Sequence, residues 1–338
     1  MENVVYDEFP TWFLIVESVS ILVLLAIVVA SFGVYLVEIQ ILYTFRTTTF
    51  KGPFYRLMFV GILVDMISAV NLFTGQIVPA RGWLSSFYFT NESLLGAIFY
   101  AITYGGRCVQ GATATILSFC RVSAVCFPVL YRKLGHPRYM HTMQVLQFAG
   151  AVASVVLLLP KDYQYVNENG GYYSAFVDNA FRKPFYNFVA VLEVFFVLSI
   201  VVNNLVTYTT YHIKFNKKRP ERAKRDSIPS GQYQISREKQ KRESSLDRMT
   251  LIVCCVELVY FAFVVYALQI NQSMNKRVFY FLYNILCVVY STFSAWMLLI
   301  VSKPVTLQFH QKFFSKLSSK RSVRSVSISV HGSRDNNK

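Results

Sequence analysis

The sequence predicts an all-α membrane protein in which seven transmembrane helices form a bundle, with the N-terminus outside and the C-terminus inside. Two observations predict the helices. First, 54% of the 338 residues are hydrophobic and only 15% are charged. Second, the apolar residues gather in seven segments that approach the roughly 20 residues needed to cross a bilayer. A third observation, the distribution of Lys and Arg, predicts the orientation.

The seven segments differ in how many charges interrupt them. Residues 18–37, 142–160 and 278–302 contain no Asp, Glu, Lys or Arg. The other four carry one interior charge each: Asp65 in 54–78, Arg107 in 94–120, Glu193 in 185–211 and Glu257 in 249–270. Helices this long and apolar lack the polar faces that a soluble protein would need. We therefore predict a domain over 11–302 with spans at 14–43, 54–78, 94–126, 141–160, 185–211, 249–271 and 278–302.

Basic residues lie mostly on one side of the predicted spans. Of the 34 Lys and Arg residues, most fall in the first and third loops, in the basic loop 214–248 and in the Ser-rich tail 303–338, which are therefore expected to face the cytoplasm. Residues 1–10 are then extracellular. Sequons at Asn91 and Asn271 fall on the predicted outer side and are candidate glycosylation sites. The basic loop is expected to face anionic lipid or an acidic partner rather than nucleic acid, because it joins two spans.

Four charged residues lie in the interior of the predicted apolar segments, where a charge is costly and usually pairs or lines a polar cavity. Asp65, Arg107, Glu193 and Glu257 are therefore candidates for an intramembrane polar network or for ligand contact. Asp65 and Arg107 lie near the middles of neighbouring spans, which predicts an ion pair, with Glu193 as a competing partner of Arg107. A pair that only fixes helix register is an equally good interpretation.

The long outer loop between the fourth and fifth predicted spans is rich in Tyr, Asn and Gly. Its tyrosines Tyr163, Tyr165, Tyr172 and Tyr173 are candidates for a lid over a ligand pocket. Tyrosines also gather at membrane interfaces as an aromatic belt, so both readings stand. None of the six cysteines lies in this loop, so no disulfide can clamp it to the third span. No cysteine pair has zinc-ligand spacing with a nearby His, and no metal or cofactor is expected.

The end of the third span carries the most specific motif, in which Arg121 is followed by Pro128 and Tyr131. A guanidinium at a helix end can bond to neighbouring helices or to an inserted peptide, and Pro128 restricts the preceding residue to an extended backbone. The Arg-x6-Pro-x2-Tyr spacing resembles that of G-protein-coupled receptors. Residues 121–131 and the close of the seventh span, 296–304, resemble nematode serpentine chemoreceptors, particularly class gamma.

The resemblance implies that Arg121, Pro128 and Tyr131 couple ligand binding to a heterotrimeric G protein. A snorkelling interfacial anchor is the alternative for Arg121. Cys120 stands where rhodopsin-like receptors have an acidic residue, and Val122 where they have an aromatic one. The sixth span contains no Pro and the seventh no Asn-Pro-x-x-Tyr, so the rhodopsin-like activation scheme is not expected as a whole.

The sequence thus predicts a chemosensory receptor in the plasma membrane, with the sensory cilium an open alternative. Its expected partners are a small external ligand, membrane lipid and a heterotrimeric G protein, and dimerisation is left open. A ligand-gated channel or transporter is the alternative, although no inverted repeat is visible. An enzyme is not expected, because no HExxH, GxSxG or paired-His motif lies in a span.

Overall fold

The computed structural model describes most of the chain, namely residues 10–48, 50, 52–168, 171–222, 251–266, 276–302 and 304–310. The N-terminal nine residues, most of the basic loop, Asn271 and the tail after 310 lie outside the described residues. The predictions made for those segments are therefore not addressed by the structure.

The described chain is mainly helical, with one small sheet. In chain order the elements are α1 (Thr11–Thr44), α2 (Pro53–Leu72), η1 (Phe73–Ile77), α3 (Val78–Ala80), α4 (Ser85–Thr90), α5 (Glu92–Cys126), α6 (Pro128–Leu134), α7 (Pro137–Leu158), β1 (Tyr163–Glu168), β2 (Gly171–Phe176), α8 (Asn179–Arg222) and α10 (Lys276–Val301). The apolar helix Leu251–Tyr266 precedes α10, and residues 304–310 form a further short helix.

Six of these helices are long and apolar enough to cross a membrane: α1, the continuous helix Pro53–Ala80, α5, α7, α8 and α10. The helix Leu251–Tyr266 is apolar but shorter, and the remainder of the predicted span 249–271 lies outside the described residues. Large apolar side chains such as Leu22, Val145 and Val191 are exposed on the flanks of the bundle. Such a surface suits contact with lipid chains, which are as apolar as the side chains themselves.

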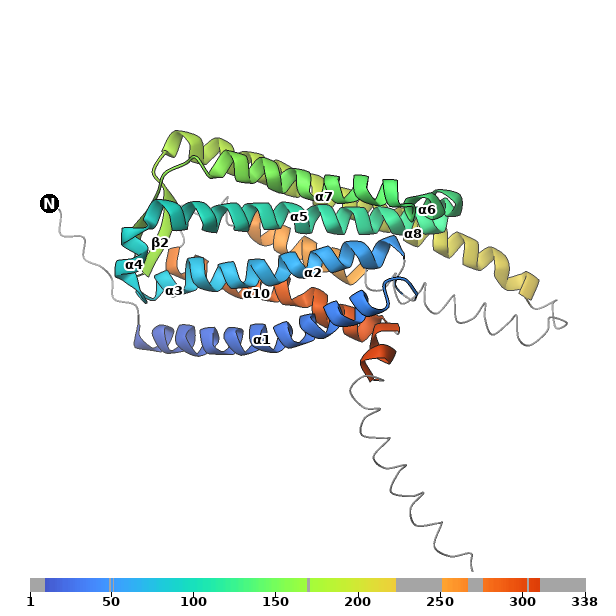
Figure 1. Cartoon of the computed structure of the whole chain (residues 1–338), viewed down its shortest axis with the longest axis horizontal. Coiled ribbons are helices and arrows are strands. Elements are labelled where there is room, and N and C mark those ends of the chain that lie inside the picture. Colours follow the sequence, from blue (N-terminus) through green and yellow to red (C-terminus); the bar gives the residue numbers. More distant parts are fainter. Residues whose placement is uncertain are drawn as a thin grey trace, which may run out of the picture.

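The long helices lie side by side along the longest axis of the molecule (Figure 1). α5 is the central helix, because it packs against α2, α7 and α8, whereas α1 and α10 pack against each other and against α2. One end of the bundle carries the β-strands with α3 and α4, and the opposite end carries α6 (Figure 1). We call these the hairpin end and the α6 end.

The outer loop forms a β-hairpin, which the all-α prediction did not include. β1 and β2 pair antiparallel, with Tyr163 opposite Phe176 and Tyr165 opposite Ser174. Alternate aromatic residues of β1, Tyr163 and Tyr165, are buried against the helices, as the period of two in a strand requires. The sequence signal for this hairpin is the Asn-Gly pair at 169–170 between two tyrosine-rich runs.

The second long helix contains a π-helical turn, η1, between α2 and α3. Pro79 follows this turn and has no N–H group, so the regular hydrogen bond from position 79 to Gly75 cannot form. The wider turn accommodates that loss: the N–H of Val78 bonds instead to the carbonyl of Phe73. Gly75 is needed here because a Cβ atom would lie 2.3 Å from the Phe99 ring on α5.

Candidate functional site

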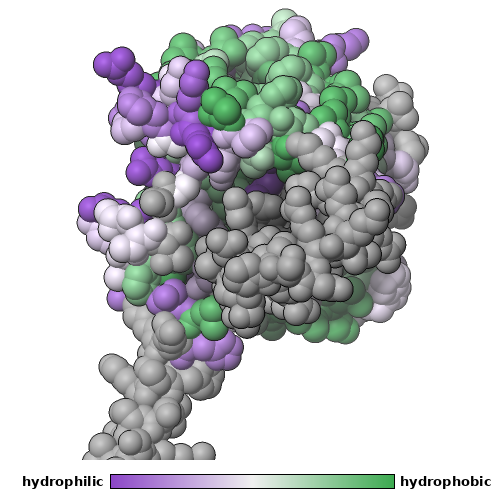
Figure 2. Space-filling model, turned by 90° about the vertical axis from the view of Figure 1, so that its right-hand side faces the viewer, coloured by the Kyte–Doolittle hydropathy of each residue, from purple (hydrophilic) through white to green (hydrophobic). Residues whose placement is uncertain are grey.

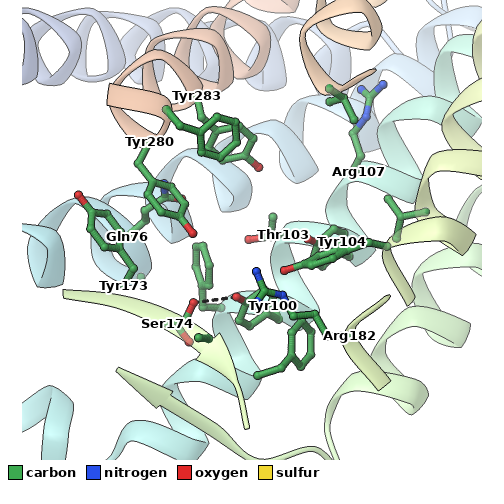
Figure 3. Close-up of a pocket in the computed structure, with 18 of the residues that line it drawn as sticks. Gln76, Tyr100, Thr103, Tyr104, Arg107, Tyr173, Ser174, Arg182, Tyr280 and Tyr283 are labelled. Carbon is green, nitrogen blue, oxygen red and sulfur yellow. Dashed lines mark hydrogen bonds between the residues drawn. The ribbon is translucent and has the colours of Figure 1, made fainter. Parts of the chain in front are cut away.

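An aromatic cavity lies inside the hairpin end of the bundle. Its volume is about 240 Å³, and its walls come from η1, α5, α8, α10, the helix Leu251–Tyr266 and the hairpin (Figure 3). The aromatic lining residues are Phe99, Tyr100, Tyr104, Tyr173, Phe176, Tyr186, Tyr260, Phe263, Phe279, Tyr280 and Tyr283. An apolar cavity of about 150 Å³ holds a benzene molecule, so this one has room for a ring with a short substituent.

The hairpin closes the cavity through contacts with α5 and α10. Tyr100 donates a hydrogen bond from its hydroxyl to the Ser174 carbonyl over 2.8 Å, which Figure 3 marks beside the cavity. Tyr173 stacks on Tyr280 of α10 with a ring-centroid distance of 4.2 Å and an interplanar angle of 11°. Stacked aromatic pairs hold a strand in place while leaving it free to separate at a modest cost.

The four candidate lid tyrosines have different places in the structure. Tyr173 lines the cavity, whereas Tyr163, Tyr165 and Tyr172 do not belong to its lining. Tyr163 donates to the Leu158 carbonyl over 2.8 Å. Tyr165 packs edge-on against Tyr88 at 5.5 Å, and burial raises the pKa of its hydroxyl above the ordinary value. These two therefore anchor the hairpin to the helices.

The inner wall of the cavity contains a charged cluster centred on Arg107. Its Nε and Nη2 donate to the two carboxylate oxygens of Glu193 over 2.6 and 2.7 Å, and Nη2 also donates to Glu257 Oε2 over 2.6 Å. The guanidinium lies over the rings of Tyr260 and Tyr290, at 4.3 and 4.6 Å. Tyr290 donates its hydroxyl hydrogen to Glu257. The cluster thus joins α5, α8, α10 and the helix Leu251–Tyr266 at one level.

The predicted Asp65–Arg107 ion pair does not form. Asp65 instead accepts hydrogen bonds from Gln110 over 2.7 Å, from Tyr35 over 3.3 Å and from Ser294. The physical reason is helix rotation, because Asp65 faces α1, α10 and the side of α5 that carries Gln110. Arg107 lies on a different side of α5 and faces α8 and the helix Leu251–Tyr266. Span adjacency in the sequence does not fix which faces meet.

Two buried carboxylates of the first helix were not among the predicted site residues. Glu17 pairs with Arg277 over 2.8 Å and with Arg81 over 3.4 Å, which ties α1 to α10 and to the turn after α3. Glu38 is fully buried near the α6 end. Both acidic residues lie inside the predicted span 14–43, which could have marked them as intramembrane charges. They were not identified because they lie at the two ends of the uncharged stretch 18–37 and do not interrupt it.

At the α6 end, the third-span motif divides between two helices. α5 ends at Cys126, and Pro128 begins the short helix α6. Arg121 is buried, and its guanidinium lies 4.6 Å from the centre of the Phe54 ring. Tyr131 packs partly buried against the apolar core at this end, whereas Pro128 is exposed. The three residues thus lie near one another in the fold without forming a single cluster.

The surface of the α6 end is mixed in character. Figure 2 views the bundle from this end and shows hydrophilic residues gathered on one side of it, with hydrophobic residues over much of the remaining visible flank. Arg132, Lys133 and Arg138 are exposed here, beside the exposed apolar side chains of Phe127 and Val129. A basic and apolar surface of this kind can contact lipid headgroups or an acidic protein partner.

The remaining predicted sites are a sequon and the cysteines. Asn91 is partly exposed between α4 and α5 at the hairpin end, and its side-chain amide donates to the Phe87 carbonyl over 3.0 Å. All six cysteines are free. No group of three or more His, Cys, Asp or Glu side chains that could hold a metal ion occurs in the described part of the chain.

Comparison with known proteins gives one family match. The model of the family described as "Serpentine type 7TM GPCR chemoreceptor Srv" matches residues 24–315, a range that contains the cavity, the Arg107 cluster and the third-span motif. A comparison with curated proteins found no match.

Proposed function

Because the chain belongs to the Srv family of serpentine 7TM GPCR chemoreceptors, we propose that it is a seven-span receptor that binds a small external ligand in the aromatic cavity and activates a heterotrimeric G protein. One observation carries the proposal: Arg107 and Glu193 line the cavity and, with Glu257, form a cluster that joins helices from three parts of the chain. A ligand there touches the residues that hold those helices together.

The proposed orientation places the hairpin end outside the cell and the α6 end in the cytoplasm. The basic loop and tail support this, since cytoplasmic loops carry the excess of Lys and Arg. The Asn91 sequon at the hairpin end supports it independently. In this topology the sixth span runs through 249–271 and brings the number of spans to seven, and the protein is a multi-pass protein of the plasma membrane. The narrower resemblance to class gamma, use of the Asn271 sequon and dimerisation stay predictions.

The proposed mechanism is a shift between two states of the bundle. A ligand that binds one state better draws the receptor into it by changing the contacts of Arg107 with α8 and the helix Leu251–Tyr266. The inner ends of those helices then move relative to α5, which carries Arg121. That movement opens the surface around Arg121, Pro128 and Tyr131 to a Gα subunit.

The test expresses the receptor in cells and measures G-protein dissociation against a panel of small external molecules. We expect a ligand that acts on the wild type to lose its effect in Arg121→Ala at equal surface expression. Arg138→Ala is the control, because it removes an exposed guanidinium from the same end of the bundle. An unchanged response in Arg121→Ala would remove that residue from the mechanism. Ligand-evoked current that persists without G protein would support a channel instead.

A further inference from the structure

Two buried hydrogen-bond donors on residues that line the cavity have no partner in the described part of the chain. They are Nε2 of Gln76 and Nη1 of Arg107, and both residues line the cavity. Gln76 is 5% exposed and Arg107 is 7% exposed. Figure 3 labels both among the residues that line the cavity, and they belong to η1 and α5. A donor buried without an acceptor carries its full desolvation penalty, so the site favours a molecule that supplies acceptors.

The backbone explains why Gln76 reaches this position. It lies in the π-helical turn η1, which adds a residue to the turn and so rotates the following side chains relative to a regular helix. Its neighbour Gly75 also lines the cavity and lets η1 approach α5 closely. π-helical turns in long helices are frequent at functional sites for this reason.

Beside the main cavity lies a recess of about 50 Å³, which shares Gln76, Thr103 and Arg107 as lining residues. A volume this small takes a single polar group but not a ring. The large cavity therefore suits the body of a ligand, and the recess suits its acceptor.

The charges around Arg107 decide which kind of acceptor fits. Arg107 is the buried cation of the cavity lining, and it is already bonded to two carboxylates, Glu193 and Glu257. Arg182 also lines the cavity, but its side chain is exposed to solvent at the start of α8, which screens its charge. A third carboxylate, from an anionic ligand, would add like charge in a water-poor site. A cationic ligand would instead meet the N–H groups of Gln76 and Arg107. An uncharged acceptor, such as a carbonyl oxygen, avoids both penalties.

We propose that the cavity takes an uncharged, single-ring molecule whose carbonyl or similar oxygen accepts hydrogen bonds from Gln76 and Arg107. This ligand class rests on the proposed function, because it names what the receptor's cavity would bind. The aromatic walls contact the ring, and the recess receives the oxygen.

The test compares four probes of the same shape and the same number of non-hydrogen atoms: acetophenone, α-methylstyrene, benzoate and benzamidinium. Binding to the purified receptor in lipid nanodiscs is measured by saturation-transfer NMR. Apolar probes also enter lipid, so an Ala190→Phe variant, which fills the cavity from α8, supplies the baseline. We expect acetophenone to bind at least about 5-fold more tightly than α-methylstyrene, because two N–H donors, one of them charged, can bond to its oxygen. Benzoate and benzamidinium should bind more weakly than acetophenone.

A second variant keeps the proposal testable without disturbing the ion cluster. Gln76→Leu removes one of the two donors, so it should lower the preference for acetophenone over α-methylstyrene by about 2-fold or more while the Arg107 bond remains. Gln147→Leu is the matched control, since Gln147 is also buried but bonds to Thr113 away from the cavity, and it should keep the full preference. An unchanged preference in Gln76→Leu would overturn the proposal and indicate that water occupies the recess.

The remaining outcomes also separate the ligand class from the receptor function. Tightest binding by benzoate or by benzamidinium would overturn the uncharged class and leave the receptor proposal standing. No binding above the Ala190→Phe baseline for any probe would remove the cavity as the site, and the proposal with it. Binding in the expected order without G-protein dissociation in cells would contradict the proposed function and not the ligand class.

Discussion

The Arg107 cluster makes a prediction about the order of stability among variants. Arg107→Met removes the cation that faces two carboxylates, and leaves Glu193 and Glu257 buried beside each other. Loss of one partner from a buried ion pair costs about 3–5 kcal/mol. Glu257→Gln removes one of two negative charges and leaves the two-bond pair of Arg107 with Glu193 intact. We expect it to cost only about 1 kcal/mol.

The measurement is thermal unfolding of purified variants in detergent, followed with a thiol-reactive dye, which is suitable because all six cysteines are free. At about 2–4 °C per kcal/mol, Arg107→Met should lower the melting temperature by about 6–20 °C. Glu193→Gln should fall between the two other variants, because it weakens two hydrogen bonds rather than one. The combined variant Arg107→Met/Glu193→Leu/Glu257→Leu should melt above Arg107→Met alone, since no uncompensated charge is left.

Two results would refute this reasoning. One is a melting temperature of Arg107→Met at or above that of Glu257→Gln. The other is a combined variant that melts below Arg107→Met, because the cost would then come from lost packing rather than from unpaired charge.

Three further predictions concern the hairpin end. Gly96→Ala should destabilise the receptor by about 1–3 kcal/mol, because the new Cβ atom would lie 2.4 Å from the Cβ atom of Tyr163. Gly33→Ala is the control, because a Cβ atom there would have nothing within 4 Å. Equal melting temperatures of the two variants would contradict the argument. Tyr173→Ala should raise the ligand dissociation rate about 2- to 12-fold by removing one stacked pair, and an unchanged rate in a binding-competition assay would exclude a lid role. Asn91→Gln should abolish a glycosidase-sensitive shift in gel mobility, and a shift that persists in this variant would assign the glycan elsewhere.

The sequence was sufficient to identify the apolar helices and the intramembrane charges. A lipid core admits long apolar helices whose backbone groups are bonded within the helix. Segments such as 142–160 and 278–302 can therefore be identified as spans from their composition alone. Asp65, Arg107, Glu193 and Glu257 stand out for the same reason, since a charge in an apolar run is rare. Glu17 and Glu38 were passed over because they flank such a run rather than interrupt it.

The sequence contains a signal for the β-hairpin, but that signal is weak beside the helical pattern of the rest of the chain. Its strands are short, and the alternation of Tyr163 and Tyr165 is only one period long, which is a weak signal inside a chain dominated by helices. The Asn-Gly pair at 169–170 is a stronger signal, because a two-residue hairpin turn needs residues that accept a positive φ.

The sequence by itself determined that this chain forms long membrane-compatible helices and which charges they carry, because the lipid solvent acts on each segment separately. Only the tertiary structure decided that Arg107 meets Glu193 and Glu257 rather than Asp65. It also decided that the π-helical turn brings Gln76 to the cavity. Both depend on how each helix is rotated about its axis, and that rotation is set by packing between helices far apart in the chain.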